Sequence, residues 1–164
     1  MSGRYCGVQR LGELHELREM SGDRGNYCNE GKKQMTIEWQ KLYDTAKAVI
    51  NPRKVSEFIE AGGVVAAVES VSGKIYVGVC VDTACTLGIC AERNAIFNML
   101  TDGESVIKRV IAISSEGNAM PPCGACRELM AQLMPDSYRS VEIMMDVEKN
   151  KVMTLGELTP EWWL

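Results

Sequence analysis

The residues best suited to chemistry in this chain are three cysteines and one glutamate, which lie in two short segments. Cys123 and Cys126 stand at positions i and i+3 of the segment Pro-Pro-Cys-Gly-Ala-Cys-Arg. In the first turn of a helix these positions point the same way, so both thiolates could reach one metal ion. Cys90, in the segment Cys-Ala-Glu-Arg, would be a third ligand. Three protein ligands leave a fourth position for water, which is typical of a catalytic zinc site and not of a structural one.

Glu92 is the fourth residue of this set. It follows Cys90 by two residues, so its carboxylate would lie near the metal without binding it. A ligand-x-Glu segment followed by Pro-Cys-x-x-Cys is the signature of zinc deaminases, in which the glutamate is the general acid and base. Zinc would lower the pKa of a bound water from about 15.7 towards roughly 7. Glu92 would take the proton and pass it towards the departing ammonia, so we predict that it is the catalytic residue.

Both segments, read with their neighbours, resemble one known family. Gly-Ile-Cys-Ala-Glu-Arg-Asn-Ala-Ile and Pro-Pro-Cys-Gly-Ala-Cys-Arg-Glu are similar to motifs of the small cytidine deaminases and of their relative, blasticidin S deaminase. The likeness runs from about Val64 to Trp163. It implies Zn²⁺ held by Cys90, Cys123 and Cys126, a homotetramer, and a role in pyrimidine salvage.

Two arginines follow the motif residues and could balance their charge. Three thiolates on one Zn²⁺ leave a net negative charge, which is unfavourable for a Lewis acid. Arg93 follows Glu92, and Arg127 follows Cys126. Either guanidinium could donate hydrogen bonds to thiolates, and the N-termini of helices that open at Cys90 and Cys123 would add partial positive charge. The alternative is that each arginine only pairs with an acidic neighbour.

The predicted substrate-binding residues are Cys80, Asp82, Ala91 and Trp163. The resemblance implies Asn-x-Glu, which grips ribose hydroxyls, where this chain has Cys80 and Asp82. Asp82 could still accept a hydrogen bond from a hydroxyl, whereas Cys80 is a weak donor and acceptor. Ala91 adjoins the first ligand. Trp163 matches a terminal aromatic that closes a neighbouring subunit's site in such tetramers, and the alternative is that it anchors the tail.

Composition limits the class of protein. The 164 residues are enough for one domain with a core, and 46% of them are hydrophobic and 24% charged. The net charge of −4 and the lack of a basic cluster argue against a nucleic-acid partner. No apolar run approaches the roughly 18 residues of a membrane helix, and no signal peptide is evident. Three of the seven cysteines are assigned to zinc, and the other four are expected to be free thiols in the reducing cytoplasm.

Two regions differ in pattern. Residues 1–34 are interrupted by glycines and form a poorly patterned N-terminal extension, in which the single histidine, His15, is expected to be a bystander. Residues 35–164 are predicted to be the catalytic domain. Phe58 is expected to be a core aromatic; the alternative is that it substitutes for the base-stacking phenylalanine that the resemblance implies at the position of Gly62. The pattern predicts helices over 36–50, 90–100 and 123–134, a short helical or irregular piece over 54–60, and strands over 64–68, 74–81, 110–114, 140–146 and 151–155.

This alternation predicts a mixed sheet with helices on both faces. The prediction agrees with the fold that the resemblance implies, a three-layer α/β/α sandwich around a mixed five-stranded sheet. The leading hypothesis is therefore an enzyme, a zinc-dependent aminohydrolase. It would convert a free cytosine-type nucleoside, cytidine or deoxycytidine, to uridine or deoxyuridine plus ammonia.

Other hypotheses remain open. The same chemistry could act on another aminopyrimidine, such as blasticidin S or a modified nucleoside. A structural zinc module closed by Cys80 or Cys85 as a fourth cysteine is a further alternative, but it gives no reason for Glu92. A thioredoxin-like redox role for Cys123 and Cys126 would leave Cys90 unexplained. Editing of polynucleotides is disfavoured because such enzymes have histidine as first ligand and a basic channel.

Overall fold

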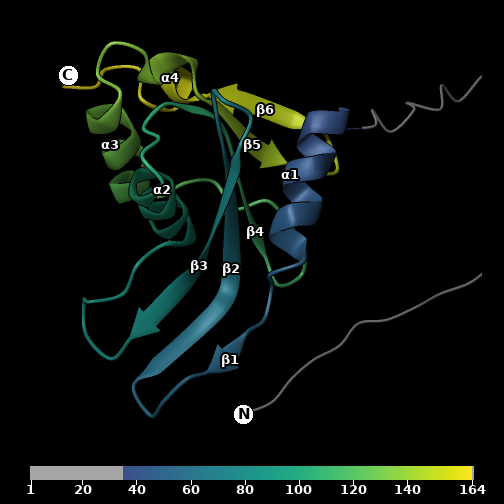
Figure 1. The fold of residues 1–164 in the computed structure, drawn as a ribbon, viewed down its shortest axis with the longest axis vertical. Coiled ribbons are helices and arrows are strands. Elements are labelled where there is room, and N and C mark those ends of the chain that lie inside the picture. Colours follow the sequence, from purple (N-terminus) through teal and green to yellow (C-terminus); the bar gives the residue numbers. More distant parts are fainter. Residues whose placement is uncertain (1–34, 164) are drawn as a thin grey trace, which may run out of the picture. The chain divides into compact units, whose positions relative to one another are not determined.

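The computed structural model describes residues 35–163, and the predicted extension with His15, Cys6 and Cys28 lies outside them (Figure 1). None of the helices in this part of the chain combines the length and the apolar character that crossing a membrane requires. The elements are α1 (Ile37–Lys47), β1 (Arg53–Lys54), β2 (Ile59–Ser70), β3 (Ile75–Thr83), α2 (Ala91–Thr101), β4 (Ile107–Ser114), α3 (Gly124–Leu133), the 3₁₀ turn η1 (Tyr138–Ser140), β5 (Glu142–Asp146), β6 (Lys151–Thr154) and α4 (Leu155–Leu158).

One mixed sheet holds the described strands together. β3 pairs with β2, β2 with β4, β4 with β5, and β5 with β6. The β4–β5 pair is parallel and the other pairs are antiparallel. The two-residue strand β1 pairs with Glu60 and Ala61 of β2 and makes six strands. The predicted α/β class and mixed sheet are confirmed, and β1 is an addition that its length of two residues hides from pattern analysis.

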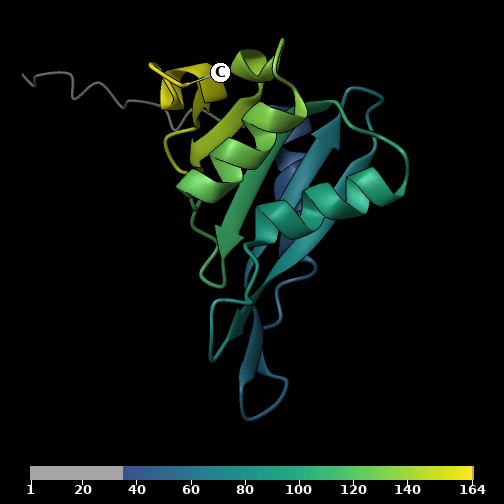
Figure 2. The same cartoon turned by 90° about the vertical axis from the view of Figure 1, so that its left-hand side faces the viewer.

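Helices cover both faces of the sheet (Figures 1 and 2). Val65 and Ala67 of β2 pack in the cluster that includes α1, whereas Ala66 and Val68 pack in the cluster that includes α2 and α3. Successive strand residues point to opposite faces, so a strand covered on both sides is a continuous apolar run. The three-layer arrangement that was predicted is therefore present.

α1 is shorter than predicted. It ends at Lys47, and residues 48–50 continue in a tighter turn in which the Val49 and Ile50 N–H groups donate to the Ala46 and Lys47 carbonyls. Pro52 follows two residues later. Its ring disfavours a helical conformation at the preceding residue, Asn51, so the helix does not continue. The buried face of the helix is formed by Trp39, Leu42 and Ala46.

The segment over residues 54–60 is not helical, which corrects one of the two options left open there. Residues 55–58 connect β1 to its antiparallel partner β2, which begins at Ile59. The register of β2 with β3 shifts between Ala61 and Val65, where Gly62 has a φ of 81°, so the strand bends. Phe58 lies in the β1–β2 connection and is 64% exposed, so its prediction as a core aromatic is wrong. This end of β2 extends beyond the helices in Figure 2.

Candidate metal centre and active site

Two helices begin at the predicted metal ligands. Cys90 is the N-cap of α2 and Cys123 is the N-cap of α3, each with an extended backbone, while Cys126 lies in the first turn of α3. The predicted helix starts are therefore confirmed. Because N–H groups in the first turn of a helix have no partner within the helix, both ends present donors and partial positive charge to the cysteine sulfurs.

The three thiols lie together. The Cys90 and Cys123 sulfurs are 3.5 Å apart, as are those of Cys123 and Cys126, and all three lie within 4.8 Å of one another. Tetrahedral zinc with Zn–S bonds of about 2.3 Å needs sulfur separations of roughly 3.8 Å. The donor set and its spacing fit a zinc site.

The electrostatics of the thiols also favour a cation. Burial raises the pKa of the Cys126 thiol, and burial followed by the Cys123 neighbour raises the pKa of Cys90. Burial opposes ionisation of Cys123 too, but hydrogen bonds from the Cys126 and Ala125 backbone and the neighbouring thiols lower its pKa. Two thiols that resist ionisation become thiolates when a metal supplies the compensating charge.

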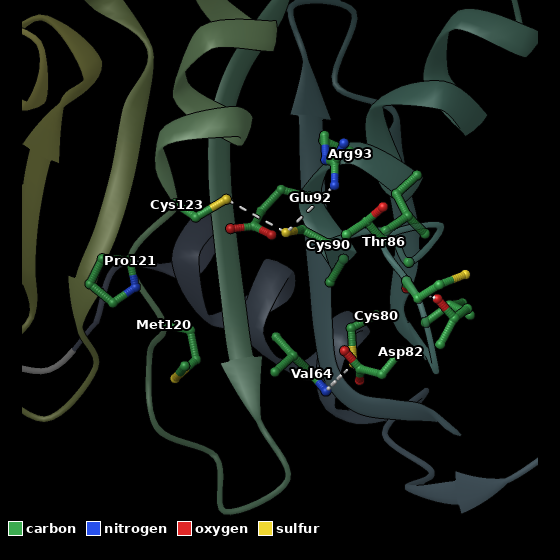
Figure 3. Close-up of a pocket in the computed structure, with 16 residues that line it drawn as sticks. Val64, Cys80, Asp82, Thr86, Cys90, Glu92, Arg93, Met120, Pro121 and Cys123 are labelled. Atoms are coloured by element: carbon green, nitrogen blue, oxygen red, sulfur yellow. Dashed lines mark hydrogen bonds between the residues drawn. The ribbon is translucent and has the colours of Figure 1, made fainter. Parts of the chain in front are cut away.

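Glu92 lies in the first turn of α2 beside the thiols. Its side chain points towards the Cys90 and Cys123 sulfurs in Figure 3 and is only 5% exposed. Burial raises the pKa of the carboxyl group, although the helix backbone, Cys126 and Arg93 act in the opposite direction. A carboxyl group with a raised pKa exchanges its proton closer to neutral pH, as a general acid and base must.

The two arginines have different surroundings. Arg93 Nη2 lies 4.0 Å from the Cys90 sulfur, and its buried Nε has no hydrogen-bond partner among the described residues. Arg127 donates from Nε to the Pro122 carbonyl (2.9 Å) and from Nη1 to the Leu158 carbonyl (3.0 Å). The described residues give Arg127 no hydrogen bond to a cluster thiol. These contacts tie the start of α3 to α4, and the charge-balancing role of Arg127 stays a prediction.

A cavity of about 410 Å³ opens beside the thiols. Cys90, Glu92 and Cys123 line one end of it (Figure 3). The predicted substrate residues Cys80, Asp82 and Ala91 also line it, and Trp163 does not. The volume lies within the range of small-molecule sites.

Sequence reasoning missed two kinds of lining residue. Met120 directly precedes the second cysteine segment, Pro121 is the first residue of that segment, and Thr86 lies in the loop before Cys90. Their nearness in sequence to the ligands was the only available signal, because none belongs to a residue type that does chemistry by itself.

The Cys80 sulfur is already engaged by the protein. It accepts a hydrogen bond from the Val64 N–H (3.2 Å) and lies 3.7 Å from Asp82 Oδ2. The Asp82 carboxylate is exposed at the same end of the cavity. Of these two side chains, Asp82 is the stronger hydrogen-bond acceptor for a ligand.

Trp163 contacts α3 of its own chain. Its Nε1 donates to both carboxylate oxygens of Glu128, at 3.1 Å each, while the side chain remains 70% exposed. This contact corresponds to the tail-anchoring alternative. A role of Trp163 in the site of a neighbouring subunit stays a prediction.

The structural-zinc alternative is not supported by the grouping of cysteines. Within residues 35–163, the group of thiols close enough to share one ion contains Cys90, Cys123 and Cys126, without Cys80 or Cys85. A site with three thiols and an adjacent buried carboxyl group has an open position, as catalytic zinc requires.

These features define an α/β protein with a zinc site at the ends of two helices beside a ligand-sized cavity. No protein-family model matches the chain. A cytidine deaminase of Halalkalibacterium halodurans is 32% identical over 73 residues, 43% of this chain and 53% of the relative, so this match spans about half the relative's length. A cytidine deaminase of Sporosarcina psychrophila is 34% identical over 93 residues, 55% of this chain and 68% of the relative.

Solved structures agree. The crystal structure of cytidine deaminase from Mycobacterium leprae matches with a TM-score of 0.62 and 26% identity, over 77% of this chain and 100% of that one. The chain belongs to the cytidine deaminase family. Cytidine deaminases are zinc enzymes, and the cluster of three cysteines fits that metal.

Proposed function

We propose that this chain is a zinc-dependent aminohydrolase that converts a free cytosine-type nucleoside, cytidine or deoxycytidine, to the uracil nucleoside and ammonia. The observation that carries the proposal is the buried Glu92 carboxyl group beside three clustered thiols at one end of the cavity. Membership of the cytidine deaminase family supports the same reaction and a nucleoside substrate.

The three cysteines and Glu92 have different roles in the proposed deamination. Cys90, Cys123 and Cys126 hold the zinc. When bound, zinc lowers the pKa of water to about 7, which makes a hydroxide nucleophile available at neutral pH. Glu92 takes one proton from the water at its carboxylate oxygen and gives it to the substrate's amino nitrogen. The water oxygen forms a bond to the ring carbon, and the carbon–nitrogen bond breaks to release ammonia. The second water proton goes to the adjacent ring nitrogen, which leaves a ring carbonyl.

Arg93 balances charge at the metal end. Its guanidinium lies 4.0 Å from the Cys90 sulfur, a contact that would shorten if the sulfur becomes a thiolate. At the other end, Asp82 accepts a hydrogen bond from a sugar hydroxyl and Ala91 lines the base. Because Asp82 and Glu92 are both carboxylates, the cavity disfavours a phosphorylated substrate, which supports a free nucleoside.

A second candidate keeps the chemistry and changes the substrate. The Cys80 sulfur is occupied by the Val64 N–H, so Asp82 provides most of the polar recognition at that end. One exposed carboxylate also suits a ligand with a cationic amine, such as blasticidin S, or a modified nucleoside.

The assembly and its setting complete the proposal. The active form is a homotetramer in the cytoplasm that works in pyrimidine salvage, with no nucleic acid or membrane partner. Exposed apolar side chains on α2, Phe97 and Leu100, and Leu87 near the cavity support burial between subunits. The described cysteines are free thiols, in keeping with a reducing compartment. Light scattering of the purified chain would give the mass of the assembly.

The test is a substrate panel. The purified full chain with one zinc per subunit is incubated with cytidine, deoxycytidine, cytosine and blasticidin S, and ammonia release is followed. Glu92→Gln is the matched control, because it keeps the shape of the side chain and removes its proton-carrying role. We expect turnover of cytidine or deoxycytidine and at least a 100-fold loss in Glu92→Gln with zinc retained. Turnover of blasticidin S alone would select the second candidate, and no release from any compound would refute the proposal.

A further inference from the structure

The outer edge of β3 is occupied by α2 and by Ile89, which lies two residues before that helix. Among residues 35–163, β3 pairs with no strand other than β2. The carbonyl groups of Val77 and Val79 accept hydrogen bonds from the side-chain amides of Asn98 (2.8 Å) and Asn94 (3.0 Å). These bonds satisfy polar groups that an edge strand would otherwise leave unpaired.

Backbone groups continue the same pattern. The Val81 N–H donates to the Ile89 carbonyl (3.0 Å), and the Ile89 N–H donates to the Val81 carbonyl (2.9 Å). Residues 77, 79 and 81 share one edge of the strand because outward-pointing carbonyls recur every second residue. We call the contacts of Asn98, Asn94 and Ile89 with this edge the three β3 rungs.

The spacing of the rungs fits the geometry of the two elements. Asn94 and Asn98 are four residues apart, which is about 6.0 Å along a helix axis. Val79 and Val77 are two residues apart, which is about 6.6 Å along a strand. The helix therefore runs antiparallel to β3 with one amide opposite each successive outward carbonyl, and a shift of α2 along β3 would break both bonds.

Gly78 brings the two backbones into contact between the rungs. A Cβ atom at this position would lie 2.2 Å from the Ala95 nitrogen and 2.6 Å from the Ala91 oxygen. No side chain separates α2 from β3 here, so the tilt and depth of the helix are determined by backbone contact and the two amide bonds.

The turn that carries the chemistry lies between two rungs. Cys90 and Glu92 are placed after the Ile89 rung and before the Asn94 rung. The Asn94 N–H also donates to the Cys90 carbonyl (3.1 Å), which closes the first turn of α2. Asn94 thus connects β3, through its side chain, to the backbone of the first metal ligand.

We propose that Asn94 is a positioning residue, which holds the Cys90–Glu92 turn at the correct height along β3 for metal binding and proton transfer. Asn98 makes the same kind of bond to the same strand one turn farther from the metal, so it is a natural control. The catalytic part of this inference rests on the proposed deaminase function, whereas the metal-binding part does not.

The experiment compares Asn94→Ala with Asn98→Ala in the zinc-loaded full chain. Three quantities are measured: the rate of zinc transfer to a chromogenic chelator, kcat and KM for cytidine, and the thermal unfolding midpoint. Both variants should lose similar stability, because each loses one amide-to-carbonyl bond. Asn94→Ala should release zinc about tenfold faster and lose about tenfold in kcat with KM within threefold, while Asn98→Ala stays within threefold in all rates.

Equal zinc-release rates in the two alanine variants would overturn the inference. The Asn94 and Asn98 amide bonds would then only attach α2 to β3, without positioning the metal ligands. Asn94→Asp is a second variant, because it keeps the shape of the side chain and cannot donate to the Val79 carbonyl when ionised. It should behave like Asn94→Ala, and normal zinc release and kcat in Asn94→Asp would also overturn the inference. If the unsubstituted chain shows no cytidine turnover, the proposed function fails, and the zinc-release comparison still decides the role of Asn94.

Discussion

Replacing Gly78 by alanine should move the helix that carries Glu92. Gly78 is buried on β3, and an added Cβ would lie 2.2 Å from the Ala95 nitrogen. Ordinary van der Waals contact begins near 3.4 Å, so one backbone must retreat by about 1.2 Å. The three nearest atoms, from Ala95, Ala91 and Asn94, all belong to the backbone of α2, and therefore no side-chain rotation can relieve the clash.

The size of the effect follows from this shift. A displacement of about 1 Å in a catalytic group can lower the rate on the order of 100-fold. Overpacking of this kind costs about 1–3 kcal/mol in the free energy of unfolding. We therefore expect Gly78→Ala to fold, to lose about 100-fold in kcat, and to bind zinc more weakly.

The assay measures kcat, zinc affinity and urea unfolding for Gly78→Ala beside Gly63→Ala. Gly63 lies on β2, where a Cβ would meet only the Cys80 sulfur, at 4.0 Å. This control changes the same residue type in the same sheet without a clash, so it should retain its stability within about 0.5 kcal/mol. If Gly78→Ala keeps kcat within threefold and an unchanged unfolding free energy, the reasoning about backbone contact is wrong.

Three other predictions concern the metal, the substrate end and the opposite face. Stripping the metal with a chelator should abolish deamination, and adding Zn²⁺ should restore it; activity that survives at less than a tenth of a zinc per chain would contradict the zinc mechanism. Asp82→Ala should raise KM for cytidine about tenfold and leave KM for free cytosine unchanged, because only the nucleoside has hydroxyl groups to bind. Arg109, which bonds Glu69 (2.8 Å) and Glu142 (2.6 Å) and covers the Trp39 ring, lies outside the site. Arg109→Ala should cost about 2 kcal/mol in chemical unfolding with kcat unchanged, and a change in kcat at full zinc occupancy would show coupling between the two faces.

Local sequence determined the parts of this protein that depend on neighbours along the chain. The i, i+3 spacing of Cys123 and Cys126 and the Cys-x-Glu order predicted where two helices begin, because capping positions and first-turn geometry are set within a few residues. Apolar, β-branched runs likewise predicted the strands over 64–68 and 74–81, which the structure contains within β2 and β3. The N-terminal extension and the roles of individual site residues stay predictions.

Only the tertiary structure decided how those pieces meet. Cys90 reaches Cys123 across 33 positions of sequence because α2 and α3 begin close together in the folded chain. Arg127 donates to the Pro122 and Leu158 carbonyls, and Phe58 is exposed because its loop extends past the helices. The pairing of Asn94 with the Val79 carbonyl depends on which strand lies at the edge. These outcomes depend on long-range packing and on competition between hydrogen-bond partners, which spacing along the chain does not encode.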